Sequence, residues 1–178
     1  MNPILYQPPR ESAAGWLAAQ VSCSTVEWHP HAALVTRALA LSAPSVGTVH
    51  VVLEGFGVNG SSILSRYQRA KLPTPKVQLV LFRLMLAVTM QARGAVSIVD
   101  IAYALDYSSP QSFGRHVRLE TGRSARAFLA QWEPEPFWRD VVAPVLRWDD
   151  ERWTTFDPLE GRRRNPVRVQ TILWGSAA

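Results

Sequence analysis

The chain has a single cysteine, Cys23, among its 178 residues. One cysteine cannot form a disulfide within the chain, and this scarcity favours a reducing compartment, so we expect a cytoplasmic protein. Long apolar runs are also missing. The longest, Val77–Met90, is shorter than a membrane-spanning helix and is interrupted by Gln78 and Arg83. The first twenty residues contain prolines and no apolar run, which predicts no signal peptide and no association with a membrane.

Charged residues are few, at 19% of the chain, whereas apolar residues make up 47%. This balance predicts a packed domain, not a disordered chain. The charge is unevenly placed. Residues 46–131 hold ten basic and four acidic side chains, while residues 1–45 are neutral and residues 132–178 hold seven basic and eight acidic ones. A basic segment is typical of a protein that binds a polyanion, although an ordinary solvated surface produces the same count.

The clearest local pattern lies within residues 96–122. Ser97 can cap a helix, Asp100 stands three residues later, and apolar side chains follow at helical spacing. Asp106 stands where this helix must end, and aspartate is one of the few residues besides glycine that tolerate left-handed backbone. Ser109, followed by proline, then starts a second helix. Two short helices joined by a tight turn predict a helix-turn-helix, which places its second helix in a DNA groove.

That second helix has two different faces. Phe113 and Val117 lie four residues apart and point toward the core. The outer face carries polar and basic side chains: Gln111, Ser112, Arg115 and Arg118. Glutamine and arginine suit bidentate contacts with purine edges, and serine and arginine suit contacts with phosphates.

A weaker copy of this pattern lies upstream. Residues 48–56 precede a turn at residues 57–60, and residues 61–72 form a basic second element. The β-branched run Val49–Leu53 could form a strand. We predict a helix because the flanking turn and the helical spacing in residues 61–72 fit better. The outer face of the second element carries Ser62, Ser65 and Arg66.

Residues 74–91 predict a long buried helix between the two units. Thr74 can cap it, Pro75 can start it, and the residues that follow are apolar nearly all round. Eighteen residues at 1.5 Å each span about 27 Å, close to the ~34 Å that separates successive major-groove segments on one face of DNA. The sequence therefore predicts an all-α fold in which two helix-turn-helix units are joined by one long buried helix.

The flanking segments are harder to interpret. Residues 1–45 predict an N-terminal arm, with a short strand at Val21–Trp28, followed by a helix from His31 to Leu41. A short helix at Ser124–Trp132 closes the second unit. Residues 132–178 form an extension rich in tryptophan and proline, with an exposed loop expected at residues 161–164 and a strand at Val167–Leu173. This extension either packs as a cap on the domain or binds a partner such as RNA polymerase or another protein.

Two chemical alternatives come from the histidines. Glu27, His29 and His31 lie close together, but zinc needs three or four ligands and no further His/Cys cluster follows, so we expect a surface turn and no metal or other cofactor. Ser112 and His116 are four apart on a helix, but no carboxylate is placed to orient the imidazole. We therefore expect no enzyme, and we expect His116 to contact phosphate.

Two stretches of the chain resemble the DNA-binding domain of AraC/XylS-type transcription regulators. They are SIVDIAYALDYSSPQSFGRHVRLETGRSARAF in the second unit and ILSRYQRAKLPTPK before the long apolar helix. The resemblance covers about residues 45–131. It implies a seven-helix domain with unit one at 46–73, a linker helix at 74–91 and unit two at 96–131, whose third and sixth helices enter consecutive major-groove segments. The chain departs from the family in the first turn, which carries an extra residue. It also departs at Asp106, where the family usually has glycine, at Ala125, where it usually has proline, and at Gly114, which lies inside the second reading helix.

The resemblance assigns contacts with bases to Ser62, Ser65 and Arg66 in the first unit and to Gln111, Ser112 and Arg115 in the second. Contacts with phosphate are expected from Arg69, Lys71, Lys76, Ser109, His116 and Arg118. Only 45 residues precede the matching segment, too few for a ligand-holding barrel, so we expect no small-molecule effector domain. The predicted function is sequence-specific binding of double-stranded DNA in transcription control. The alternative is a helical protein-interaction module that uses the tryptophan-rich extension and does not read DNA.

Overall fold

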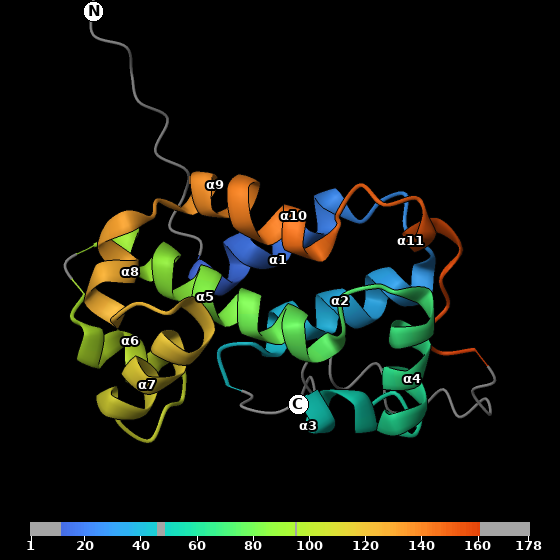
Figure 1. The fold of residues 1–178 in the computed structure, drawn as a ribbon, viewed down its shortest axis with the longest axis horizontal. Helices are drawn as coiled ribbons and strands as arrows, with labels where there is room; N and C mark the ends of the chain where they lie inside the picture. The colour runs from blue at the N-terminus through green and yellow to red at the C-terminus, as the bar shows by residue number, and fades with distance from the viewer. Residues whose placement is uncertain (1–11, 46–48, 95, 161–178) are drawn as a thin grey trace, which may run out of the picture.

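The computed structural model describes residues 12–45, 49–94 and 96–160, and in these ranges every regular element is helical (Figure 1). The helices are α1 (Ala13–Ser24), α2 (Pro30–Ser42), α3 (Val49–Glu54), α4 (Gly60–Ala70), α5 (Pro75–Arg93), α6 (Ile98–Ala104), α7 (Pro110–Thr121), α8 (Ala125–Gln131), α9 (Pro134–Phe137), α10 (Ala143–Leu146) and α11 (Arg152–Thr155), with a π-helical turn at Trp138–Val142 between α9 and α10. The all-α prediction is confirmed. The ambiguous run after residue 48 is helix α3, not a strand.

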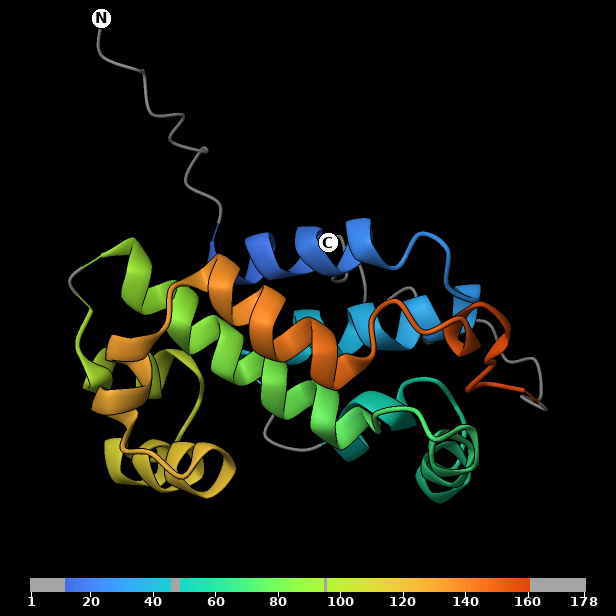
Figure 2. The ribbon, with the colours of Figure 1, turned by 45° about the horizontal axis from the view of Figure 1, so that its top comes forward.

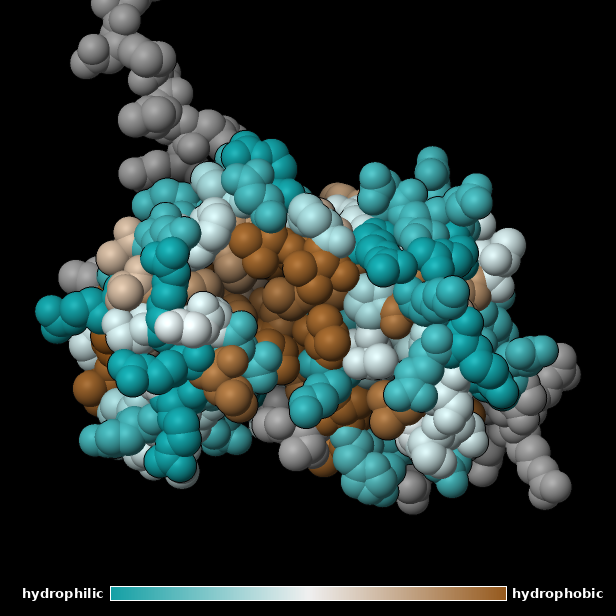
Figure 3. Space-filling model, in the orientation of Figure 1, coloured by the Kyte–Doolittle hydropathy of each residue, from teal (hydrophilic) through white to brown (hydrophobic). Residues whose placement is uncertain are grey.

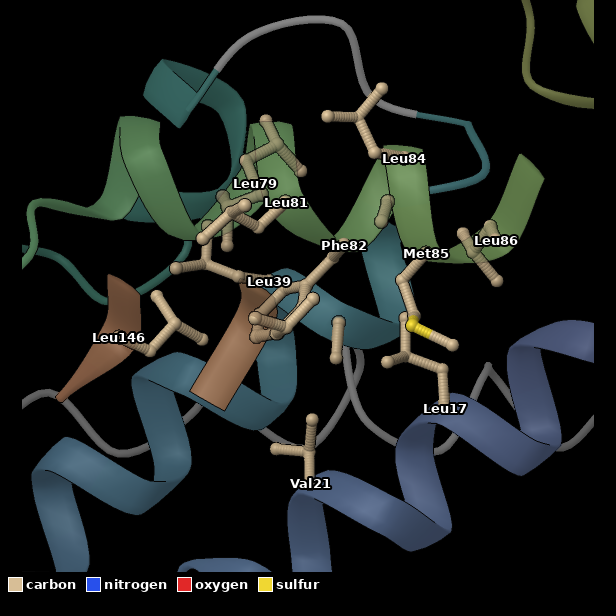
Figure 4. Close-up of a cluster of buried hydrophobic side chains, with 14 of the residues drawn as sticks. Leu17, Val21, Leu39, Leu79, Leu81, Phe82, Leu84, Met85, Leu86 and Leu146 are labelled. Atoms are coloured by element: carbon tan, nitrogen blue, oxygen red, sulfur yellow. The ribbon is translucent and has the colours of Figure 1, made fainter. Parts of the chain in front are cut away.

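Helix α5 runs through the middle of the molecule (Figures 1 and 2). It starts at Pro75, as predicted, and nearly all side chains in its central turns are buried. Figure 4 shows Leu17 of α1 and Leu39 of α2 gathered with Phe82 and Met85 of α5. Full burial of one such side chain contributes about 1.5–3 kcal/mol, so the packing on α5 dominates the core.

The N-terminal prediction was partly wrong. Residues 13–24 form helix α1 and not an arm, and Val21 is a buried helical residue and not the start of a strand. Ser12 is the N-cap of the helix, and its side chain accepts a hydrogen bond from the Gly15 N–H at 3.0 Å. The helix is rich in alanine and packs against α2 and α5, so tertiary contacts decide its structure. The helix predicted at His31–Leu41 is confirmed as α2.

The described part of the C-terminal extension, residues 132–160, packs against the domain. Trp153 is fully buried and stacks on Trp28, with 3.9 Å between ring centroids. The indole N–H of Trp148 donates to the Ser24 carbonyl at 2.7 Å, and that of Trp28 donates to the Trp148 carbonyl at 3.2 Å. This segment is a cap. The loop expected at 161–164 and the strand expected at 167–173 lie outside the described residues.

One hydrophobic cluster unites buried residues from before residue 46, from 46–131 and from after residue 131, so packing is continuous across the expected segment boundaries. Within the described ranges, no single helix combines the length and apolar character needed to cross a bilayer. Only α4 and α5 taken together, bent by 89°, meet that test by length and composition.

Candidate nucleic-acid interface

The second helix pair, α6 and α7, is built by local capping. The Ser97 side chain accepts from the Asp100 N–H at 3.2 Å, while the Asp100 carboxylate accepts from the Ser97 N–H at 2.9 Å. The hydroxyl and then the backbone N–H of Ser97 donate to the Asp100 carboxylate, and these two hydrogen bonds hold the pKa of Asp100 below its ordinary value. Asp106 adopts the left-handed backbone that the sequence predicts, with φ 57°. Ser109 caps α7 by accepting from the Ser112 N–H at 3.1 Å.

The faces of α7 also follow the prediction. Phe113 and Val117 are buried, whereas Gln111, Arg115 and Arg118 are exposed. Within the described residues, neither Arg115 nor Arg118 forms an ion pair, so both guanidinium groups are available to an external anion. The outer face of α7 therefore presents one amide and two cationic side chains to solvent.

Two predicted site residues on the second pair are less open. Ser112 is half-buried, and its hydroxyl lies within hydrogen-bond distance of the Ser108 and Ser109 hydroxyls, at 3.2 and 3.0 Å. Ser109 is half-buried as well and serves as the helix cap. Both hydroxyls stabilise the start of α7.

His116, which was assigned to phosphate, is engaged by side chains of its own domain. Its Nδ1 forms a short hydrogen bond with the Tyr107 hydroxyl, and its Nε2 lies 3.8 Å from the Glu120 carboxylate. Burial lowers the pKa of His116, Glu120 opposes this shift, and Arg83 adds to it. A half-buried neutral imidazole next to a carboxylate binds an anion poorly. Ser112 is hydrogen-bonded to its neighbouring serines and not to His116, so the two do not form a nucleophile–base pair.

Arg83, on α5, lies at the centre of a network that the sequence analysis did not identify. It is 5% exposed and donates to the Ala43 carbonyl at 2.8 Å, to the Leu105 carbonyl and to the Tyr107 hydroxyl at 3.2 Å. Its guanidinium carbon also lies 4.5 Å from the centroid of the Tyr107 ring. The network joins α5 to the end of α2, to the end of α6 and, through Tyr107 and His116, to α7. The signal in the sequence was a lone arginine inside an apolar helix.

The first helix pair, α3 and α4, carries the other predicted contacts. Asn59 caps α4 by accepting from the Ser61 N–H at 2.9 Å. Ser62, Ser65 and Arg69 are exposed on the outer face. Lys71 ends the helix in left-handed conformation, with φ 54°, and its side chain is exposed.

Arg66 is less open than its predicted role requires. Arg66 is half-buried, and its guanidinium donates to the Pro158 carbonyl at 3.4 Å. The extension therefore contacts this side chain, which the resemblance and the outer face of α4 had assigned to base contact. Arg152 also reaches α4 and donates to the Ala70 carbonyl at 3.1 Å. A hydrogen bond from Arg152 holds the pKa of Asp150 down to about 2.

Helices α4 and α7 lie toward opposite ends of α5 and on the same edge of the molecule in both ribbon views (Figures 1 and 2). Helix α5 has 19 residues, which corresponds to about 28 Å. Lys76, in its first turn, is exposed. The two amphipathic helices are thus separated by one stiff buried element.

The molecular surface between the two helix pairs is largely apolar. Figure 3 shows hydrophobic side chains gathered over the middle of α5, with polar side chains covering the lobes on either side. A groove here is lined by Val77, Val80 and Leu84 of α5 and by Val141 and Val145 of the extension. Charged side chains border this groove at one end, where Lys76, Glu120 and Arg123 contribute to its lining.

The group of potential metal ligands differs from the one considered in the sequence. His29 is the N-cap of α2, and Pro30 is its first residue. Glu27 is exposed and does not join the histidines, whereas Asp157, far along the chain, does. Sequence proximity suggested the wrong carboxylate because the third group comes from the folded-back extension.

No protein-family model, no curated protein and no solved structure matches this chain.

Proposed function

We propose that the protein binds double-stranded DNA sequence-specifically and regulates transcription, with α4 and α7 as its two reading helices. The observation that carries the proposal is the placement of two short helix pairs at the ends of one buried helix, each with a polar outer face on its second helix. A stiff spacer of roughly one DNA helical turn suits two helices that enter successive major-groove segments.

The charges support a polyanionic ligand. Residues 46–131 hold ten of the basic side chains and only four of the acidic ones. Arg69, Lys71 and Lys76 are exposed on or beside α4, and Arg115 and Arg118 are exposed on α7. Such cations neutralise phosphates and release counterions, which gives affinity without sequence preference.

Direct reading of bases falls to a smaller set. Gln111 and Arg115 on α7 have the donor and acceptor geometry for purine edges in the major groove. Ser62 and Ser65 on α4 are exposed but short, and Arg66 is engaged by Pro158. We therefore infer that the second pair supplies most of the specificity and the first pair mainly positions the duplex.

The test has two steps. The untagged chain is first used to select bound fragments from a random duplex pool, and enrichment of one motif of about 15–20 base pairs is expected if both helices enter the groove. Binding of that motif is then followed by fluorescence at two salt concentrations. A protein that contacts several phosphates weakens steeply as salt rises. Failure to enrich any motif, together with salt-independent binding, would refute the proposal.

A second candidate function is binding to another protein through the apolar groove over α5. Val77 and Val145 are 38% and 46% exposed there, whereas the tryptophans expected to form a docking surface are largely packed inside. Exposed apolar patches mark protein interfaces. A stable complex that is insensitive to salt and forms without DNA would favour this candidate.

A further inference from the structure

Three potential metal ligands from distant parts of the chain meet at the start of α2. One ligand atom each from His29, His31 and Asp157 lies within 4.8 Å of the other two, and all three residues are half-buried. The Nδ1 of His31 and a carboxylate oxygen of Asp157 are 2.8 Å apart. We propose that this His29/His31/Asp157 cluster binds a divalent transition-metal ion of the zinc class, a site independent of any DNA interface.

The cluster is held in place by contacts with the extension and by a hydrogen bond to the Asp157 carboxylate. The His29 N–H donates to the Trp153 carbonyl at 2.8 Å, which fixes α2 against the extension. Trp28 stacks on Trp153 next to this contact. The Leu159 N–H donates to the Asp157 carboxylate at 2.8 Å and orients it. The frame that brings the ligands together is therefore present before an ion arrives.

The two ring nitrogens of His29 can serve different purposes. The Nδ1 of His29 accepts from the His31 N–H at 3.3 Å as the helix cap, which leaves its Nε2 for a metal ion. Zinc binds nitrogen and oxygen at about 2.0–2.2 Å, so two ligand atoms of a tetrahedral site lie about 3.3–3.6 Å apart. The three ligand atoms lie within 4.8 Å of one another and the His31 and Asp157 atoms are 2.8 Å apart, so binding requires the ligand groups to shift and the His31–Asp157 hydrogen bond to open.

The donor set selects the kind of ion. Two imidazoles and one carboxylate suit zinc, cobalt or iron(II), whereas calcium and magnesium prefer oxygen ligands only. The other two histidines of the chain lie elsewhere: His50 pairs with Glu54 on α3, and His116 pairs with Tyr107. The remaining coordination positions would be filled by water, as in zinc sites with three protein ligands.

The competing explanation is an ordinary ion pair between His31 and Asp157 that fastens the extension to α2. Calorimetric titration of the full, untagged chain with Zn²⁺ separates the two. We expect one ion per chain, a higher unfolding temperature with Zn²⁺ and visible d–d absorption with Co²⁺. Loss of a residue that merely orients a ligand costs about 10–100-fold in metal affinity, so His31→Ala is expected to cost about 100-fold or more.

The chain offers a matched control. His50 and Glu54 form a histidine–carboxylate pair at 3.0 Å without a third ligand, so His50→Ala should leave Zn²⁺ binding unchanged. Asp157→Asn keeps the shape of the side chain and should weaken binding as His31→Ala does. Circular dichroism of each metal-free variant establishes that its helices are intact. Absence of one-to-one binding in the wild-type chain would overturn the proposal. Undiminished binding in well-folded His31→Ala would overturn it as well, and so would loss of binding in well-folded His50→Ala.

Discussion

Replacement of Arg83 by leucine is expected to destabilise the protein by about 3 kcal/mol. The side chain is 5% exposed and makes hydrogen bonds with the Ala43 and Leu105 carbonyls and with the Tyr107 hydroxyl. Leucine fills much of the same volume but donates no hydrogen bond. The variant therefore leaves two main-chain carbonyls at helix ends without this donor.

The magnitude follows from opposing contributions. A hydrogen bond to a charged group contributes about 1.5–3 kcal/mol net, so three of them contribute about 4.5–9 kcal/mol. A buried leucine recovers about 1.5–3 kcal/mol through apolar burial. Removal of the buried charge also relieves a desolvation cost of several kcal/mol. A net loss of about 3 kcal/mol corresponds to a fall of about 6–12 °C in unfolding temperature for a chain of this size.

The assay is urea and thermal unfolding followed by circular dichroism. Lys76→Leu is the matched control, because Lys76 lies on the same helix and is exposed. Its effect should stay within about 0.5 kcal/mol, as for most surface substitutions. If Arg83→Leu is as stable as this control, the network does not hold the second helix pair to α5, and the reasoning fails.

Three further outcomes are expected. Arg115→Ala should cost about 1–3 kcal/mol of binding free energy for the selected duplex and less for a random duplex. Arg69→Ala should weaken binding to both duplexes equally and reduce the dependence of binding on salt concentration. Equal losses for Arg115→Ala on both duplexes would contradict base reading. Burial depresses the pKa of His116 in the folded chain, so the unfolded chain takes up this proton first and stability falls as pH drops below about 6.5. Urea midpoints should show this fall reduced in His116→Gln, and an unchanged fall would refute the assignment. Gly114→Ala should raise stability by about 0.5–1 kcal/mol in the same assay, because a Cβ there meets nothing within 4 Å and alanine favours a helix; a lower midpoint would argue against it.

The second helix pair could be predicted because its determinants are local. The Ser97–Asp100 box, the left-handed Asp106 and the Ser109 cap act within a few residues, and the structure contains all three. The alternation of buried Phe113 with exposed Arg115 depends only on helical periodicity. Local rules of this kind predict a single helix and its two ends.

Sequence patterns do not indicate a partner that lies outside the helix concerned. Periodicity places Arg66 and His116 on partly outward faces, but Arg66 donates to the Pro158 carbonyl, which lies 92 residues away, and His116 bonds the Tyr107 hydroxyl, which lies 9 residues away before α7. The same holds for His31, whose carboxylate partner lies 126 residues away. In each case a polar side chain pairs with a group that folding brings to it, and a pattern within one helix contains no information about that group.

Different contacts fix the orientations of the two candidate reading helices. Helix α7 is tied to α5 through the buried Arg83 network, within the central segment itself. Helix α4 is held at its C-terminal end by the extension, because Arg152 and Arg147 donate to the Ala70 and Lys71 carbonyls at 3.1 Å each. Cations at this end also interact favourably with the helix dipole. A helix that is already oriented loses less freedom when it binds. If the proposed function holds, the described part of the extension therefore sets the orientation of α4 and with it the affinity that the first pair contributes, while α7 is oriented through α5.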